Sequence, residues 1–267
     1  MKPAGDLEKW ADRFRDLPET PPERATTEII TDLHLPTESG EPTERFIRWL
    51  SERERPGNWL CLGDLFDTWV GRAQLRCSGA IDVSYAVAGS CNAESWLDLI
   101  PGNRDTLLDD AFEAESLAEL YPDGLVLVRP CGTRILCLHG DELCVREAGY
   151  LRLRAIMRSR PFRALSRVAP LWFARWVGRR LRSSFSGSKG PRNPERGPQA
   201  DAALAAAKAA GASILVTGHT HVFEDRILPG PEGIRWVTLG AFGDGRDVGR
   251  IVDRPEGATL EVGDATP

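Results

Sequence analysis

Five short segments of the sequence end an apolar run with residues that bind metal ions well. They are Ile29–His34, Leu60–Asp67, Leu99–Asp105, Ile135–Asp141 and Ile214–His221. All 4 histidines of the chain lie in these segments, although no fold requires histidine there. An apolar run that stops at a polar turn is typical of a buried strand that delivers ligands to the edge of a sheet. The sequence therefore predicts one site assembled from five strand ends.

The side chains in these segments that could bind a metal are Asp32, His34, Asp64, Asn103, His139, His219 and His221. Imidazole combined with carboxylate suits Mn, Fe, Ni or Zn, whereas Mg and Ca sites consist mostly of oxygen ligands. These ligands exceed what one ion needs, so we expect two divalent ions, Mn ahead of Fe, Ni or Zn, bridged by one carboxylate. Two ions about 3.5–4 Å apart clamp the attacking and leaving oxygens of a phosphoryl displacement and activate water near neutral pH. The predicted reaction is hydrolysis of a phosphoester or phosphoanhydride.

Each segment alone has a simpler interpretation. The stretch Gly102–Asp105 would be an ordinary turn in most proteins, because Gly and Asn tolerate a left-handed backbone. Asp32 with His34, or His219 with His221, would more often be solvated turn residues. The ordered occurrence of all five segments favours a metal site over five unrelated turns.

Helical patterns alternate with these strands. A strand at Thr27–Leu33, an amphipathic helix at Pro42–Glu54 and a strand at Leu60–Gly63 form a βαβ unit, which predicts a parallel pair of strands. We expect a further helix at Thr106–Leu120, whereas residues 70–93 indicate only a loop or a helix. The sequence thus predicts an α/β fold.

The second half of the chain adds a hairpin, a helix and short strands. Leu125–Arg129 and Thr133–Leu138 predict the hairpin, and the alanine-rich stretch Gln199–Ala210 predicts the helix. Strand patterns separated by turns then follow Val222.

Length and composition bound the class of protein. A chain of 267 residues with 42% hydrophobic and 27% charged residues can bury one full core. No stretch approaches the roughly 20 apolar residues of a spanning helix, and the N-terminus lacks the pattern of a secretory signal. The 6 cysteines include no Cys-x-x-Cys pair, so we interpret them as small buried residues in a reducing, cytosolic compartment.

Charge is distributed unevenly along the chain. The net charge of −5 argues against general nucleic-acid binding, yet the stretch from Arg146 to Arg192 has thirteen basic residues and one acid, Glu147. Leucines and aromatic residues alternate with these arginines, so we expect two or three short amphipathic helices, broken at Pro161 and Pro170. A helical hairpin with solvated charges is the simpler alternative.

This pattern divides the chain into three parts. We expect an N-terminal extension at residues 1–26 and a core formed by residues 27–145 and 196–267. Residues 146–195 would be a basic helical cap inserted into that core.

The motifs resemble those of the calcineurin-like metallophosphoesterase superfamily in order and type. The matching motifs are Asp32-x-His34, Gly63-Asp64-x-x-Asp67, Gly102-Asn103-Arg104-Asp105, His139-Gly140-Asp141 and Gly218-His219-Thr220-His221. The resemblance implies a four-layer αββα sandwich of two mixed sheets. It also implies that Asp32, His34 and His221 hold one metal. Asn103, His139 and His219 would hold the other, and Asp64 would bridge them.

Arg104 narrows the resemblance, because many superfamily members have histidine at this position. With Gly-Asp-Leu-Phe-Asp-x-Trp, His-Gly-Asp-x-Leu-Cys and the basic insertion, the chain resembles the UDP-2,3-diacylglucosamine pyrophosphatases of lipid A biosynthesis. These enzymes cut their nucleotide-sugar lipid into UMP and 2,3-diacylglucosamine 1-phosphate. The resemblance implies a monomer at the cytoplasmic face of the inner membrane, with cap arginines meeting phosphates and cap apolar residues meeting acyl chains.

The resemblance also assigns roles around the metals. Asn103, Arg104 and Asp105 are the candidate catalytic residues, and Arg104 would stabilise charge on phosphate oxygens. Asp67, Asp105 and Asp141 would orient other ligands. The candidate substrate contacts are Arg104, Glu147, Tyr150 and Lys189.

Other functions stay open at this point. The family usually has Thr-Asp-Asp where this chain has Val145-Arg146-Glu147, so the substrate could be another nucleotide diphosphate or a phosphodiester. A metal-free scaffold that binds proteins would have lost ligands, and none is missing. A nucleic-acid-processing enzyme would use the basic cap on phosphates, but apolar and aromatic residues outnumber base-reading residues there.

Overall fold

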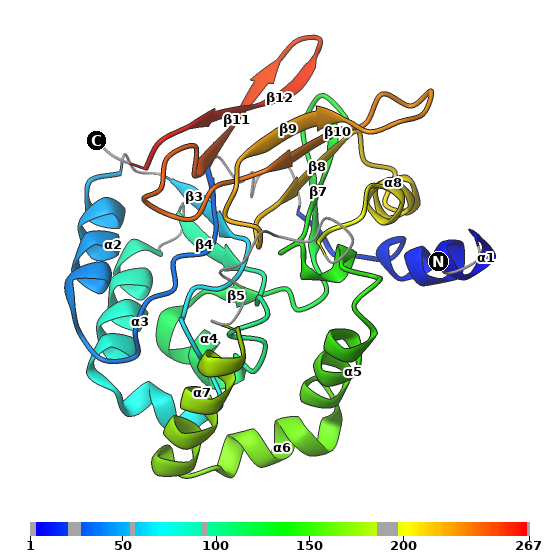
Figure 1. The fold of residues 1–267 in the computed structure, drawn as a ribbon. Coiled ribbons are helices and arrows are strands. Elements are labelled where there is room, and N and C mark those ends of the chain that lie inside the picture. Colours follow the sequence, from blue (N-terminus) through cyan, green and yellow to red (C-terminus); the bar gives the residue numbers. More distant parts are fainter. Residues whose placement is uncertain (1–3, 21–27, 54–56, 92–94, 186–196, 266–267) are drawn as a thin grey trace.

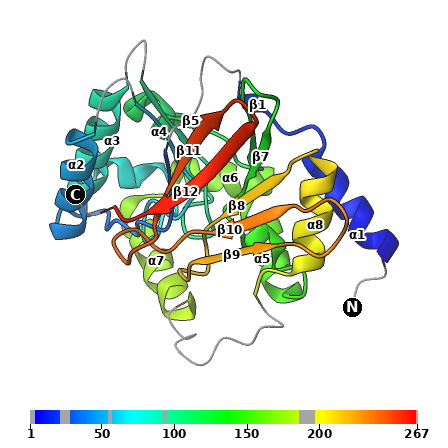
Figure 2. The same ribbon diagram turned by 90° about the horizontal axis from the view of Figure 1, so that it is seen from above.

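The computed structural model describes residues 4–20, 28–53, 57–91, 95–185 and 197–265. They form four layers, helices on each outer side of two stacked sheets, as the view from above shows (Figure 2). The predicted α/β sandwich of two mixed sheets is confirmed.

The first sheet has six strands in the order β12-β11-β2-β3-β4-β5. Their bounds are β2 Glu28–Ile30, β3 Asn58–Cys61, β4 Trp96–Leu99, β5 Glu119–Leu120, β11 Val248–Arg254 and β12 Gly257–Gly263. Strands β2 to β5 run parallel, as the predicted βαβ unit requires. Helices α2 (Glu41–Ser51), α3 (Ser78–Ser90) and α4 (Asp110–Ser116) lie on its outer side (Figure 1).

The second sheet has six strands in the order β1-β6-β7-β8-β10-β9. Their bounds are β1 Glu19–Thr20, β6 Leu125–Val128, β7 Arg134–Cys137, β8 Ile214–Thr217, β9 Glu224–Ile227 and β10 Arg235–Thr238. β6 and β7 form the predicted hairpin, and β7, β8 and β10 are parallel. Helices α1 (Ala4–Ala11) and α8 (Ala200–Ala209) cover its outer side (Figure 1).

Alternating side chains build the core on both sides of each sheet. In the first sheet Ile29 and Leu60 point between the sheets, where they meet Leu127 and Val216 of the second. Their neighbours in the chain, such as Ile30, point outward to the helices instead. Because both faces are covered, these strands are continuous apolar runs, and their carboxyl ends meet at one edge of the sandwich.

The basic stretch forms three helices, α5 (Ala148–Met157), α6 (Arg160–Val168) and α7 (Leu171–Phe185). The first break falls at residues 158–159, just before Pro161 in the first turn of α6, and the second at residues 169–170, close to the predicted positions. Figure 1 shows the helices as an arc beneath the sheets. No helix among the described residues is long and apolar enough to cross a membrane.

Several arginines of these helices form ion pairs with acids elsewhere in the chain, and most of these pairs remain partly exposed to solvent. Arg158 on α5 pairs with Asp123 at 3.0 Å, and Arg167 on α6 pairs with Asp110 at 3.0 Å. Arg175 on α7 pairs with Glu38. Part of the positive charge of these helices is therefore paired with carboxylates of the sandwich and its loops.

One further expectation needs correction. The helix expected at Thr106–Leu120 covers only Asp110–Ser116, because Leu117 adopts a left-handed φ of +58° and Glu119–Leu120 pairs with β4. Residues 4–20 pack on the sandwich through buried Phe14 and Leu17. The boundaries expected at 26 and 195 lie outside the described residues.

Candidate metal centre

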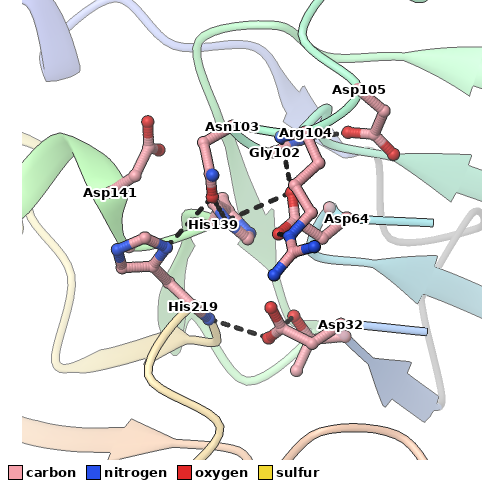
Figure 3. Close-up of polar contacts among 12 residues, drawn as sticks. Asp32, Asp64, Gly102, Asn103, Arg104, Asp105, His139, Asp141 and His219 are labelled. Atoms are coloured by element: carbon pink, nitrogen blue, oxygen red, sulfur yellow. Dashed lines mark hydrogen bonds and ion pairs between the residues drawn. The ribbon is translucent and has the colours of Figure 1, made fainter. Parts of the chain in front are cut away.

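The loops that follow β2, β3, β4, β7 and β8 converge at one edge of the sandwich. They bring together all seven candidate ligands: Asp32, His34, Asp64, Asn103, His139, His219 and His221. Figure 3 shows Asp32, Asp64, Asn103, His139 and His219 around one small space. The carboxyl ends of strands from both sheets thus form a single site.

One half of this space is bounded by Asp32, His34 and His221. The Nε2 atoms of the two histidines are 2.9 Å apart. Oδ1 of Asp32 lies 3.2 Å from His221 Nε2 and 3.8 Å from His34 Nε2. The other carboxylate oxygen, Oδ2, accepts hydrogen bonds from the Thr31 hydroxyl and the His219 amide, each at 2.8 Å. Asp32 is therefore held through one oxygen and presents the other to the histidines.

The other half contains Asn103, His139 and His219. Oδ1 of Asn103 lies 3.0 Å from His139 Nε2 and 3.1 Å from His219 Nδ1. His139 Nδ1 donates to the carbonyl oxygen of Leu62 at 2.6 Å. This bond fixes the tautomer of His139 and leaves Nε2 facing the site.

Asp64 lies between the halves. Its Oδ1 is 3.7 Å from His139 Nε2, and its Oδ2 is 3.9 Å from His34 Nδ1. The backbone amide of Arg104 donates to Oδ1 at 2.9 Å. A carboxylate with one oxygen toward each half has the geometry that a bridging ligand needs.

The backbone bends sharply at most of these residues. Asp32, His34, Asp64, His219 and His221 have φ between +50° and +69°, in the left-handed region. For residues other than glycine this conformation costs on the order of 1–3 kcal/mol each and is concentrated at functional sites. The folded sandwich holds these turns in place, and the side chains point inward as a result.

The donor set fits divalent cations. Oδ1 of Asp32 and Nδ1 of His34 are buried and have no hydrogen-bond partner among the described residues. A buried carboxylate oxygen of this kind costs free energy unless a cation or a donor compensates it. Two imidazole nitrogens 2.9 Å apart beside that oxygen are ligands that Mn, Fe, Ni and Zn accept.

Without metal, the pKa values of three histidines of the site are shifted in different directions from the ordinary value. Burial lowers the pKa of His34 to about 3 and that of His219 to about 4. Burial acts the same way on His139, but the carboxylates of Asp64 and Asp32 outweigh it and raise the pKa of His139 to about 9. Burial also raises the pKa of Asp64. His139 therefore holds a proton near neutral pH that a metal ion would displace.

Arg104 lies at the rim of the site. Its Nη1 donates to Asp67 Oδ1 at 2.9 Å, and its Nε lies 3.5 Å from Asp64 Oδ2. Asp105, by contrast, is fully buried behind the loop and accepts hydrogen bonds from the amides of Gly102 and Phe66. Asp105 thus orients the loop and cannot contact substrate directly, so its place among the catalytic candidates changes to a positioning one.

The candidate substrate contacts have different environments. Tyr150 lies near Asn103 in the lining of a small pocket beside α5, but its hydroxyl donates to Asp141. Glu147 precedes α5 and is half-buried. Lys189 lies outside the described residues.

Sequence reasoning missed Glu142 and Arg154. Arg154 on α5 donates to Glu142 Oε1 at 2.7 Å, and both side chains are buried. In the sequence Arg154 is one of many arginines and Glu142 an ordinary acid beside the His139 motif. The one signal in the sequence for this pair is an acid, Glu142, directly after the His139-Gly140-Asp141 motif, followed by a basic helical segment that contains Arg154.

Comparison with known proteins agrees with this geometry. The chain matches the family described as Calcineurin-like phosphoesterase over residues 28–223. It is 35% identical over 220 residues to a UDP-2,3-diacylglucosamine hydrolase of Ralstonia nicotianae, covering 78% of this chain and 81% of that protein. It is 31% identical over 201 residues to a UDP-2,3-diacylglucosamine hydrolase of Pseudomonas paraeruginosa, covering 72% of this chain and 80% of that protein.

Proposed function

The chain belongs to the calcineurin-like phosphoesterase family of metal-dependent hydrolases, and from this premise we propose that its substrate is UDP-2,3-diacylglucosamine. The proposed products are UMP and 2,3-diacylglucosamine 1-phosphate, so the enzyme would act in lipid A biosynthesis. The names and coverage of its relatives support this substrate. The alternative is another nucleotide diphosphate or a phosphodiester.

The proposed cofactor is a pair of divalent ions, with Mn as the first choice and Fe, Ni or Zn as alternatives. Asp32, His34 and His221 would hold one ion and Asn103, His139 and His219 the other, with Asp64 shared. When bound, such ions lower the pKa of water and stabilise charge on the reacting phosphate. The buried Oδ1 of Asp32, which faces the imidazoles of His34 and His221, supports this assignment.

Arg104 would stabilise the negative charge that develops on the diphosphate. Its planar guanidinium is anchored by Asp67 at 2.9 Å, so its orientation is set before substrate binds. Arginine is not a proton donor at neutral pH. A phosphate leaving group needs little protonation, so an arginine at this position suits cleavage of a diphosphate.

The observation that best supports an acylated substrate is the exposure of apolar side chains on α5, α6 and α7. Large apolar side chains exposed on these helices are Leu153, Ile156, Leu165, Val168, Trp172 and Trp176. Val168 is 76% exposed and Trp172 is 70% exposed. Exposed large apolar side chains on three consecutive helices favour a ligand, protein or membrane contact.

We propose that residues 146–195 form a cap whose apolar residues receive the acyl chains and contact the membrane surface. Exposed arginines on the same helices, among them Arg152, Arg179 and Arg180, would attract anionic lipid. The proposed location is peripheral, at the cytoplasmic face of the inner membrane. The apolar character of this surface argues against nucleic acid as the partner.

Product analysis tests this proposal. Purified protein with Mn is given UDP-2,3-diacylglucosamine, the same UDP-sugar without acyl chains and a simple phosphodiester, with Asp64→Ala as the control. The proposal expects UMP and the diacylated sugar phosphate from the first substrate only. Equal turnover of all three would retain the metal chemistry and reject the lipid substrate.

A further inference from the structure

A buried ion-pair network joins α5 to the turn behind the metal site. Arg154, only 7% exposed, lies with Nε 2.9 Å from Asp141 Oδ2 and donates through Nη2 to Glu142 Oε1 at 2.7 Å. Tyr150, one turn earlier on α5, also donates to Asp141. Asp141 and Glu142 follow His139 directly after Gly140, so α5 is fastened to the segment that carries a candidate ligand.

Glu142 also contacts the turn that holds the candidate ligands His139 and His219. Its second oxygen, Oε2, accepts a hydrogen bond from the Gly140 amide at 2.9 Å. Gly140 has a φ of +117°, and a Cβ there would lie 3.3 Å from Cβ of His219. The Gly218 amide in turn donates to the His139 carbonyl at 2.8 Å. Arg154, Glu142 and Gly140 therefore form a continuous support for the turns of His139 and His219.

Stability alone does not account for this arrangement. Burying an arginine with two carboxylates has a large desolvation cost, and apolar side chains of similar size are often as stable. Arg167 and Arg175 fasten α6 and α7 with half-exposed ion pairs that do not touch the turn. The feature peculiar to Arg154 is its connection to metal ligands.

We propose that Arg154 is a positioning residue for the half of the metal site formed by Asn103, His139 and His219. The small pocket between α5 and the Asn103 loop, lined by Asn103, Tyr150 and Arg154 among others, places the helix against this half and not against Asp32 and His34. The packing of α5 against the turn of Asp141 and Glu142 would thus be coupled to metal binding by Asn103, His139 and His219. The inference rests on the proposed pair of ions but not on the lipid substrate.

Metal binding by Arg154 variants tests the coupling. Mn binding to the metal-depleted full chain is followed by calorimetry and by metal content after equilibrium dialysis. In the Arg154→Met variant, the ion held by Asp32, His34 and His221 (the first ion) should bind as in the unaltered protein. The ion held by Asn103, His139 and His219 (the second ion) should bind about 10- to 100-fold more weakly, the usual effect of removing a partner of a metal ligand. His219→Ala gives the reference for loss of the second ion.

Further variants distinguish a role of Arg154 in positioning the metal ligands from a role in attaching α5 to the sandwich. Arg167→Met removes an ion pair of α6 that is remote from the turn and should leave both Mn affinities unchanged. Glu142→Gln keeps an acceptor for the Gly140 amide and should weaken the second ion less than Arg154→Met. Arg154→Lys retains the buried charge, so it carries the test if Arg154→Met does not fold, and it should also weaken the second ion.

The outcomes are distinct. A folded Arg154 variant that binds both ions with unchanged affinity overturns the inference, and so does equal weakening of both ions. If the unaltered protein does not bind two ions, the proposed metal site fails and the inference fails with it. Failure to cleave the acylated substrate while two ions bind would reject only the proposed function.

Discussion

The guanidinium of Arg104 donates to Asp67 Oδ1 at 2.9 Å while its Nε lies 3.5 Å from Asp64 Oδ2. The arginine beside Asp64 is therefore held by the carboxylate that follows Asp64 by three residues. This pairing holds the guanidinium of Arg104 beside the carboxylate of Asp64. An arginine held in this way can stabilise charge on phosphate oxygens without donating a proton.

Replacing Arg104 should therefore impair turnover more than metal binding. Arg104→Ala should lower kcat about 10²- to 10³-fold, as removal of a charge-stabilising donor does in other enzymes. Arg104→Lys should recover only part of this, because an ammonium lacks the planar fork. Steady-state kinetics with metal content measured in parallel checks the prediction. A variant that keeps full kcat would contradict the role of Arg104.

Asp67→Asn should weaken the orientation of Arg104 without removing its charge. We expect a fall in kcat of about tenfold, smaller than that of Arg104→Ala. In the double variant with Arg104→Ala, Asp67→Asn should have little further effect, because the two residues act as a unit. Independent, additive losses would show that Asp67 acts elsewhere.

Metal binding should release protons. In the metal-free protein the carboxylates of Asp64 and Asp32 raise the pKa of His139 to about 9, so His139 holds a proton at pH 7. His34 and His219, with pKa values lowered to about 3 and 4, are neutral there and release none. Because ligands bind deprotonated, Mn affinity should increase from pH 7 to about pH 9 and then level off. Calorimetry in two buffers of different ionisation enthalpy measures the protons released, and identical heats would contradict the prediction.

Gly218 should not tolerate a side chain. A Cβ there would lie 2.0 Å from Thr31 Oγ1 and 2.6 Å from Asp32 Oδ2, so Gly218→Ala must displace the turn or Asp32. We expect about 1–3 kcal/mol of lost stability and weaker binding of the ion beside Asp32. Gly149→Ala on α5 is the control, because its Cβ would meet no atom within 4 Å. Equal unfolding temperatures and Mn affinities for the two variants would contradict this interpretation.

The sequence was sufficient to predict that the seven candidate ligands lie together, because the carboxyl ends of parallel strands must share an edge. It also located the helix breaks near Pro161 and Pro170, where proline chemistry acts locally. It could not show the left-handed backbone of Asp32 or His34, since neighbouring loops impose that conformation.

Tertiary contacts also decided the remaining differences. The helix expected at Thr106–Leu120 was too long, because pairing of Glu119–Leu120 with β4 overrides helical propensity. The arginines of α5 to α7 appeared equivalent in the sequence, yet Arg154 is buried against Asp141 and Glu142. Such partners lie in other segments of the chain, and a single sequence does not reveal them.

The most direct test of the account compares kcat/KM for UDP-2,3-diacylglucosamine and for the same UDP-sugar without acyl chains. The account predicts a strong preference of the Mn-loaded protein for the acylated substrate. This preference should fall when the exposed Trp172 and Trp176 are replaced together by alanine, while Mn binding stays unchanged. Equal kcat/KM values for the two substrates, or a preference that survives this double substitution, would contradict the proposal that α5 to α7 receive the acyl chains.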